Sequence, residues 1–273
     1  MPYSAWTQTA LPPQLELPAA GRCHLWPVPI TGADRLRPLL DEAELERAAR
    51  YKSTSALETF VVSRAAQRLV VAWYLGGPPE AVRIARDCQL CEGTGRDEHG
   101  RPYIAGSDLD FSVSHAAGWL LIAVVGAGRV GVDAESVSAT RSVDDLADRV
   151  LSPAEQQEFA GTPAAERAAF FLRAWTRKEA AVKLTGHGLV APLSHLDVRG
   201  PELAASPAPE QWPTGPIHLR DVPADGDMLA AIASTAPITS LELCGPLPEM
   251  LPGMPPGMPL PGMSQPPPDF DAG

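Results

Sequence analysis

The chain has 273 residues, 45% of them hydrophobic, so it is long enough to bury one large core or two of ordinary size. Its 33 acidic and 22 basic residues give a net charge of −11, which argues against general nucleic-acid binding. Four cysteines are too few for a disulfide scaffold, and no segment resembles a secretory signal or a membrane span. We therefore expect a soluble, cytoplasmic protein that neither enters a membrane nor binds nucleic acid.

The first half of the chain predicts two helices followed by a pair of strands. Segments 41–52 and 55–75 each open with an N-cap residue followed three positions later by glutamate, namely Asp41 with Glu44 and Ser55 with Glu58. Segments 111–115 and 120–125 are separated by the turn sequence AAGW and predict a β-hairpin.

The second half predicts a strand, two helices and further strands. The sequence GVDAES at 131–136 continues an apolar run as a strand. Proline at N1 and a capping box of Ser152 with Glu155 predict a helix from Pro153. A longer helix is expected from Thr162-Pro163 to about Leu184, followed by short strands between Pro and Gly turns.

This order of elements predicts a mixed α+β protein with two similar halves, assigned to residues 1–118 and 119–245. Residues 246–273 hold ten prolines in 28 positions. Such a composition excludes a helix and predicts a disordered tail with polyproline II character.

Three carboxylates stand out as candidates for chemistry. Asp133 and Glu135 point to one face of a strand, where two like charges are mildly destabilising. The sequence AWTRKEAAVKL at 174–184 places Glu179 on a helix with Trp175, Lys178 and Lys183 nearby. If this helix packs against the strand end, the carboxylates suit a magnesium ion, and Lys178 and Lys183 face the phosphates of a substrate. The alternative is an ordinary Glu–Lys pair on a solvated face.

Four motifs together resemble those of the 4′-phosphopantetheinyl transferases of the longer, single-chain Sfp type. They are HGRPY at 99–103, SVSHA at 112–116, GVDAE at 131–135 and WTRKEAAVK at 175–183, in the order of that family. The resemblance covers about residues 40–200. It implies two pseudosymmetric subdomains, each a small antiparallel sheet packed with a long helix. It also implies transfer of phosphopantetheine from coenzyme A (CoA) to a serine of an apo carrier protein, releasing adenosine 3′,5′-bisphosphate.

The resemblance assigns roles to the matching positions. Mg²⁺, or Mn²⁺ in its place, would be held by Asp133, Glu135 and Glu179. Catalysis is assigned to Asp133, to Lys183 at the leaving phosphate, and to Glu179 as base toward the incoming serine, with Glu155 a weaker candidate base. CoA contacts are assigned to Arg47, Arg101, Ser114, His115, Trp175, Lys178 and Lys183.

Several of these residues also have plain structural interpretations. His115 fits a strand-end histidine bonded in the core, and Arg101 fits a surface turn. Glu155 completes a capping box without any catalytic role. Cys88 and Cys91 have the spacing of zinc ligands, with His99 as one further donor, but no fourth ligand follows and two reduced thiols are the simpler interpretation.

One departure from the family pattern concerns the grip on the CoA 3′-phosphate. Thr59 stands where the family has an arginine, and Glu44 stands where it has a lysine. Arg47 remains, and Arg64 is close enough in sequence to compensate, as are Arg50 and Lys52. Loss of one charge-assisted contact, worth about 1.5–3 kcal/mol, predicts weaker CoA binding or tolerance of dephospho-CoA.

The resemblance implies a monomer that acts on fatty-acid, polyketide or nonribosomal-peptide carriers. An alternative is an inactive CoA-binding or scaffolding homologue that recruits partners through the Pro-rich tail. A third interpretation, an unrelated magnesium phosphohydrolase, explains the acidic residues but not the motifs at 112–116 and 175–183.

Overall fold

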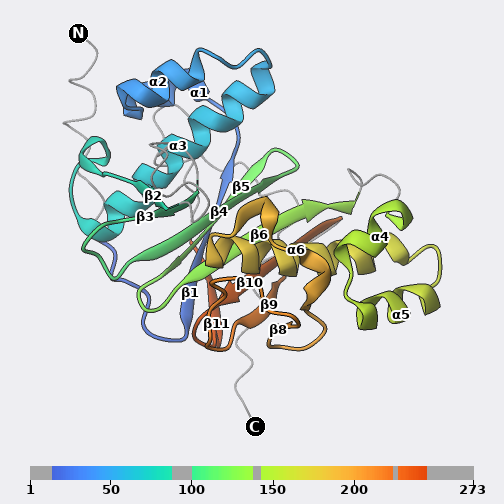
Figure 1. Cartoon of the computed structure of the whole chain (residues 1–273). Helices are drawn as coiled ribbons and strands as arrows, with labels where there is room; N and C mark the ends of the chain where they lie inside the picture. The colour runs from blue at the N-terminus through green and yellow to red at the C-terminus, as the bar shows by residue number, and fades with distance from the viewer. Residues whose placement is uncertain (1–13, 88–99, 138–142, 224–226, 245–273) are drawn as a thin grey trace.

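A computed structural model of the chain describes residues 14–87, 100–137, 143–223 and 227–244 (Figure 1). Within these ranges the protein has two main sheets, each packed with one long helix, and two small two-stranded sheets, β2-β3 and β7-β8, so the predicted α+β class is confirmed. No helix in the described part of the chain has the length and apolar character needed to cross a membrane. The predicted tail and the Cys88–Cys91 pair with His99 lie outside the described residues.

The first sheet has four strands in the order β11-β1-β5-β4, with β1 parallel to β11 and the other neighbours antiparallel. The predicted hairpin is present as β4 and β5. The predicted boundary between residues 118 and 119 falls in its turn, so β5 and β11 come from beyond that boundary. The strand bounds are β1 Arg22–Pro29, β4 Asp110–Ala116, β5 Trp119–Val125 and β11 Ser240–Leu243.

The helix of the first half is α3, Thr54–Leu75, which packs on the first sheet around Phe111, Ile122 and Val124. Its N-cap is Ser53, whose side chain accepts a hydrogen bond from the Ala56 N–H. The predicted cap, Ser55, is wrong by two positions, because Ser53 is the residue with extended backbone and Ser55 already lies within the helix.

The second sheet has three antiparallel strands in the order β6-β10-β9. The long helix α6, Arg167–Thr185, packs against β6 and β10. It begins four residues later than predicted, because residues 163–166 form a separate turn. The strand bounds are β6 Val130–Ser136, β9 His218–Val222 and β10 Met228–Ser234.

Short elements surround these two layers. In Figure 1, α4 and α5 lie on the far side of the molecule from α1 and α2. The capping boxes predicted for α2 and α5 are both present. The bounds are α1 Ala33–Leu36, α2 Glu42–Ala48, α4 Asp144–Val150, α5 Pro153–Gly161, β2 Ala85–Asp87, β3 Arg101–Tyr103, β7 Leu196–Asp197 and β8 Ala204–Ala205. Four short 3-10 turns complete the described part, namely Arg37–Leu39, Pro79–Ala81, Gly188–Val190 and Leu193–His195.

The two sheets meet at their edge strands, β4 and β6, through side chains. Every second residue of β4 accepts a hydrogen bond from every second backbone N–H of β6. The pairs are Asp110 with Val130 (2.8 Å), Ser112 with Val132 (3.1 Å) and Ser114 with Ala134 (3.2 Å). This side-chain ladder satisfies N–H groups of an edge strand and fixes the register between the two halves.

The contact between β6 and α6 requires a glycine at position 131. An ideal Cβ on Gly131 would lie 2.0 Å from the Ala180 carbonyl oxygen and 2.6 Å from the Leu184 backbone nitrogen. Both distances are far shorter than any real carbon contact, and both neighbours are backbone atoms that cannot rotate away. The strand therefore reaches the helix only because residue 131 lacks a side chain.

We predict that Gly131→Ala lowers the free energy of unfolding by about 3 kcal/mol or more, because the added methyl group forces α6 away from β6. Chemical denaturation measures the change. Gly161→Ala at the end of α5 is the matched control, since a Cβ there meets nothing within 4 Å. Equal stability of the two variants would contradict the close approach.

Candidate active site

The site lies where β6, α6 and the end of β4 meet. Alternation along β6 places Asp133 and Glu135 on the face toward α6. Trp175, Glu179 and Lys183 follow one another at intervals of four along α6 and so face the strand. The glycine contact at residue 131 holds these two rows of side chains within reach of each other.

Asp133, Lys183 and Ser114 form a closed triangle of hydrogen bonds. The Lys183 Nζ donates to Asp133 Oδ1 (2.7 Å) and to Ser114 Oγ (2.8 Å), and the Ser114 hydroxyl donates to the same Oδ1 (2.8 Å). Asp133 is buried, whereas the Lys183 side chain is 31% exposed. The structure thus brings together three of the predicted site residues.

The second oxygen of Asp133 has no partner. Oδ2 is buried and makes no hydrogen bond among the described residues. A buried carboxylate oxygen left in this way carries a desolvation penalty, which a bound cation would remove. This orphaned atom is the observation that fits a hard metal ion such as Mg²⁺.

The carboxylates of Glu135 and Glu179 lie close to Asp133, and its negative charge acts on both of them. Burial raises the pKa of Glu179, and Asp133 and Glu135 raise it further against the opposing effect of Lys183. Burial and Asp133 likewise raise the pKa of Glu135, while a hydrogen bond from Trp175 Nε1 (3.1 Å) acts in the opposite direction. All three carboxylates are therefore close enough to repel one another.

The three carboxylates are not gathered around a common point. No group of three or more His, Cys, Asp or Glu side chains within the described ranges is arranged to hold a metal ion. One oxygen of Asp133 is bound by Lys183 and one oxygen of Glu135 by Trp175. The predicted three-carboxylate site stays a prediction, which would require Glu135 and Glu179 to turn toward the free oxygen of Asp133.

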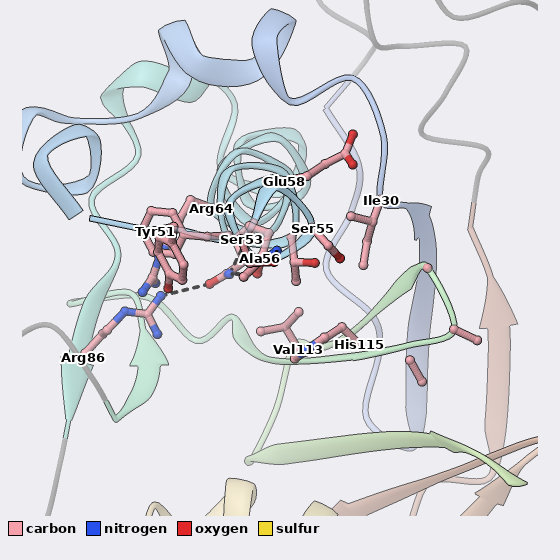
Figure 2. A pocket seen from close by; sticks show the side chains of 17 residues that line it. Ile30, Tyr51, Ser53, Ser55, Ala56, Glu58, Arg64, Arg86, Val113 and His115 are labelled. Carbon is pink, nitrogen blue, oxygen red and sulfur yellow. Dashed lines mark hydrogen bonds between the residues drawn. The ribbon is translucent and has the colours of Figure 1, made fainter. Parts of the chain in front are cut away.

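A pocket of about 700 Å³ opens beside this cluster, between the start of α3 and the β4–β5 hairpin (Figure 2). Arg64 and Arg86 contribute positive charge to its lining, and Glu58 contributes negative charge. His115 points into the pocket from β4, and its pKa is lowered by partial burial and by the nearby Lys183. Its neighbour Ser114 belongs to the hydrogen-bonded triangle, so the pocket and the triangle both lie at the end of β4.

Lys178 lies elsewhere, which corrects the expectation that it faces substrate phosphates. Its side chain has no exposed surface, and its amine donates to Glu155 and to the carbonyl oxygens of Val150 and Leu193. The physical reason is the helix rotation of 100° per residue, which turns Lys178 away from Glu179 and toward α4 and α5. Glu155 is likewise consumed by this ion pair and by its capping box, so it is not available as a base.

Two further predicted contacts also lie apart from the Asp133–Lys183 pair. Arg101 forms an ion pair with Asp110 and is largely buried at the opposite end of β4 from Ser114. Arg47 stacks over the Phe60 ring, 5.4 Å from its centre, on the side of α3 that also carries Arg64. Arg47 therefore lies near the pocket, because Phe60 is part of the lining.

Sequence reasoning overlooked Arg86 as a pocket residue. It comes from the three-residue strand β2 and donates to Gln67 Oε1 (3.3 Å), which fixes it against α3. A strand this short has no detectable periodicity. The one available signal was its charge in an acidic chain.

Acidic side chains beside a lysine and a basic pocket are typical of enzymes that handle phosphate esters. Residues 129–222 match the sequence model of the 4′-phosphopantetheinyl transferase superfamily. The 4′-phosphopantetheinyl transferase HetI of Nostoc sp. is 29% identical over 232 residues, which cover 81% of this chain and 91% of that protein. These similarities bear out the predicted 4′-phosphopantetheinyl transferase superfamily, whereas the Sfp type stays a prediction.

Two other relatives match over shorter regions. The 4′-phosphopantetheinyl transferase of Bacillus subtilis is 33% identical over 106 residues, covering 38% of this chain and 46% of that protein. The 4′-phosphopantetheinyl transferase AcpT of Salmonella typhimurium is 36% identical over 90 residues, covering 33% and 47%. The chain thus spans about half the length of these two relatives.

We predict that Glu179→Gln stabilises the protein at pH 8 by about 1 kcal/mol, or about 2–4 °C in melting temperature. The raised pKa means that ionised Glu179 is less favourable in the folded than in the unfolded chain, so stability is lost as pH rises from 4.5 through the raised value. The amide avoids this loss, and the gain should disappear toward pH 4.5.

Thermal unfolding of both proteins between pH 5 and 8 measures this difference. Glu46→Gln, on the exposed side of α2, is the matched control and should change the melting temperature little at any pH. A Glu179→Gln protein that is no more stable than wild type at pH 8 would show that the carboxylate is compensated in the folded state.

Proposed function

We propose that this protein transfers the 4′-phosphopantetheine of CoA to a serine of an apo carrier protein, in a Mg²⁺-dependent reaction. The observation that carries the proposal is the Asp133–Lys183–Ser114 triangle beside a basic pocket, with a buried oxygen of Asp133 left unpartnered. In this reaction the serine Oγ forms a bond to the β-phosphorus of CoA. The bond to the bridging oxygen breaks, and adenosine 3′,5′-bisphosphate leaves.

Two residues of α6 assist this step: one accepts the proton of the serine hydroxyl, and the other stabilises the negative charge on the leaving phosphate. Glu179 accepts the proton of the carrier serine, because its carboxylate lies on the face of α6 that is turned toward the site. Lys183 donates a hydrogen bond to the leaving phosphate, because its partly exposed amine already lies at the site. Glu179 must be ionised to accept this proton, so activity should fall as the pH is lowered into the range where its carboxyl group becomes protonated.

Asp133, through its unpartnered Oδ2, would hold Mg²⁺ or Mn²⁺ together with Glu135 and Glu179 once these two side chains turn toward it. The cation would supply positive charge to neutralise the CoA pyrophosphate. The cation also relieves the repulsion that raises the pKa of both glutamates. The unpartnered oxygen and the chemistry of the donors support this placement.

The pocket of Figure 2 suits the nucleotide end of CoA. His115 of its lining directly follows Ser114 of the triangle in β4, and Arg64 and Arg86 supply positive charge for phosphate groups. The two sheet–helix halves and the order of the four motifs favour the single-chain Sfp type, acting as a cytoplasmic monomer. Acyl carriers of fatty-acid synthesis and carriers of polyketide or nonribosomal-peptide synthesis are all candidate acceptors.

The direct test is the intact mass of an apo carrier protein incubated with CoA, Mg²⁺ and this protein. We expect a gain of one phosphopantetheine with wild type. Glu179→Ala should lower kcat/KM by about 10²–10⁴-fold, because the serine loses its base. Glu46→Ala is the control and should retain wild-type activity.

No mass gain on fatty-acid, polyketide or peptide carriers, from a folded protein that binds CoA, would overturn the proposal. That result would favour the inactive CoA-binding alternative, in which the pocket is retained without turnover.

The charge of the pocket gives a second prediction, on substrate choice. Glu44 pairs with Arg68 (2.5 Å) and with Arg64 (3.7 Å), so part of the positive charge near the pocket is already neutralised. Thr59, also in the lining, adds none. We therefore expect kcat/KM for CoA to exceed that for dephospho-CoA by less than about tenfold, the value of one weak charged contact.

Glu44→Gln should raise this preference for CoA, because it removes the charge that competes for Arg64. Glu42→Gln, in the exposed first turn of the same helix, should leave the ratio unchanged. A wild-type preference of a hundredfold or more would contradict the prediction. Steady-state kinetics with both substrates gives the ratio.

A further inference from the structure

The hydroxyl of Ser114 has used its whole hydrogen-bonding capacity inside the protein. It donates to Asp133 Oδ1 (2.8 Å) and accepts from Lys183 Nζ (2.8 Å) and from the Ala134 N–H (3.2 Å). A serine hydroxyl has one donor and two acceptor positions, so none remains. Ser114 is also 5% exposed. A substrate phosphate could gain a bond from this hydroxyl only by breaking one of these three.

We propose that Ser114 is a positioning residue for the metal-binding carboxylate, and that it does not bind CoA. Its bond to Oδ1 fixes the rotation of the Asp133 carboxylate, so that Oδ2, the oxygen without a partner, is presented to the cation. Its bond from Lys183 keeps that amine beside the same carboxylate. The proposal rests on the proposed function for the identity of the cation.

The hydrogen bond from the Ala134 N–H explains how Ser114, a residue of the first sheet, can orient a carboxylate of the second sheet. The Ala134 N–H belongs to β6, and it holds the Ser114 oxygen as the last step of the ladder between β4 and β6. Asp133, its neighbour in β6, is therefore oriented by a strand of the other half of the molecule. A carboxylate that is bound by its outer partners in one orientation binds metal more tightly than a freely rotating one.

The ladder also provides a matched control. Ser112 lies two residues earlier in β4, is equally buried, and accepts a hydrogen bond from the Val132 N–H (3.1 Å). Within the described residues it makes no hydrogen bond to Asp133 or Lys183. Removing its hydroxyl therefore removes the same kind of strand contact without disturbing the carboxylate.

The test is Mn²⁺ binding measured by electron paramagnetic resonance, with saturating CoA and no carrier protein, so that no turnover occurs. We expect Ser114→Ala to weaken Mn²⁺ binding by about 10–100-fold, the usual effect of losing an outer partner of a ligand. Ser112→Ala should bind Mn²⁺ within twofold of wild type. CoA affinity without metal, from isothermal titration calorimetry, should change less than threefold in both variants.

Ser114→Thr, which keeps the hydroxyl, should restore Mn²⁺ binding, and Ser114→Cys replaces Ser114→Ala if the alanine variant does not fold. Wild-type Mn²⁺ affinity in Ser114→Ala with a tenfold loss of CoA affinity would overturn the inference and make Ser114 a substrate contact. Absence of Mn²⁺ binding by wild type with CoA present would also overturn it. If Mn²⁺ binding by wild type and the variants follows these expectations but wild type transfers nothing to carrier proteins, the positioning role is upheld and the proposed function alone is refuted.

Discussion

The close contact of α6 with β6 at Gly131 is the constraint on which the site depends. Backbone atoms of the helix occupy the volume that any side chain at this position would need. The contact brings Asp133 and Glu135 of the strand opposite Glu179 and Lys183 of the helix. The packing of two backbones, and not any attraction between the charged groups, therefore determines where these groups meet.

The charges themselves oppose folding at this site. Burial and mutual repulsion raise the pKa of both Glu135 and Glu179, and one oxygen of Asp133 has no partner. Lys183 compensates only part of this charge. The two well-packed halves and their ladder of hydrogen bonds hold the carboxylates together, and the stored repulsion is what a cation would relieve on binding.

A second ion pair stabilises the same helix from its opposite side. Lys178 and Glu155 are both fully buried, and each has additional hydrogen bonds that offset the loss of hydration. The pair connects α6 to α5. The two lysines of this motif therefore differ in role: Lys183 faces the site, whereas Lys178 attaches α6 to α5.

The sequence alone determined the α+β class, the superfamily motifs and two of the three predicted capping boxes, because each depends on local spacing or on short motifs. Alternation along 131–136 was enough to place Asp133 and Glu135 on one face. The sequence could not determine that Lys178 turns inward while Lys183 turns toward Asp133, because both fit the helical spacing. Nor could it show the three bonds of Ser114 or the place of Arg86. Those contacts join residues 19 to 69 positions apart, and only the packing of the two sheets and their helices brings them together.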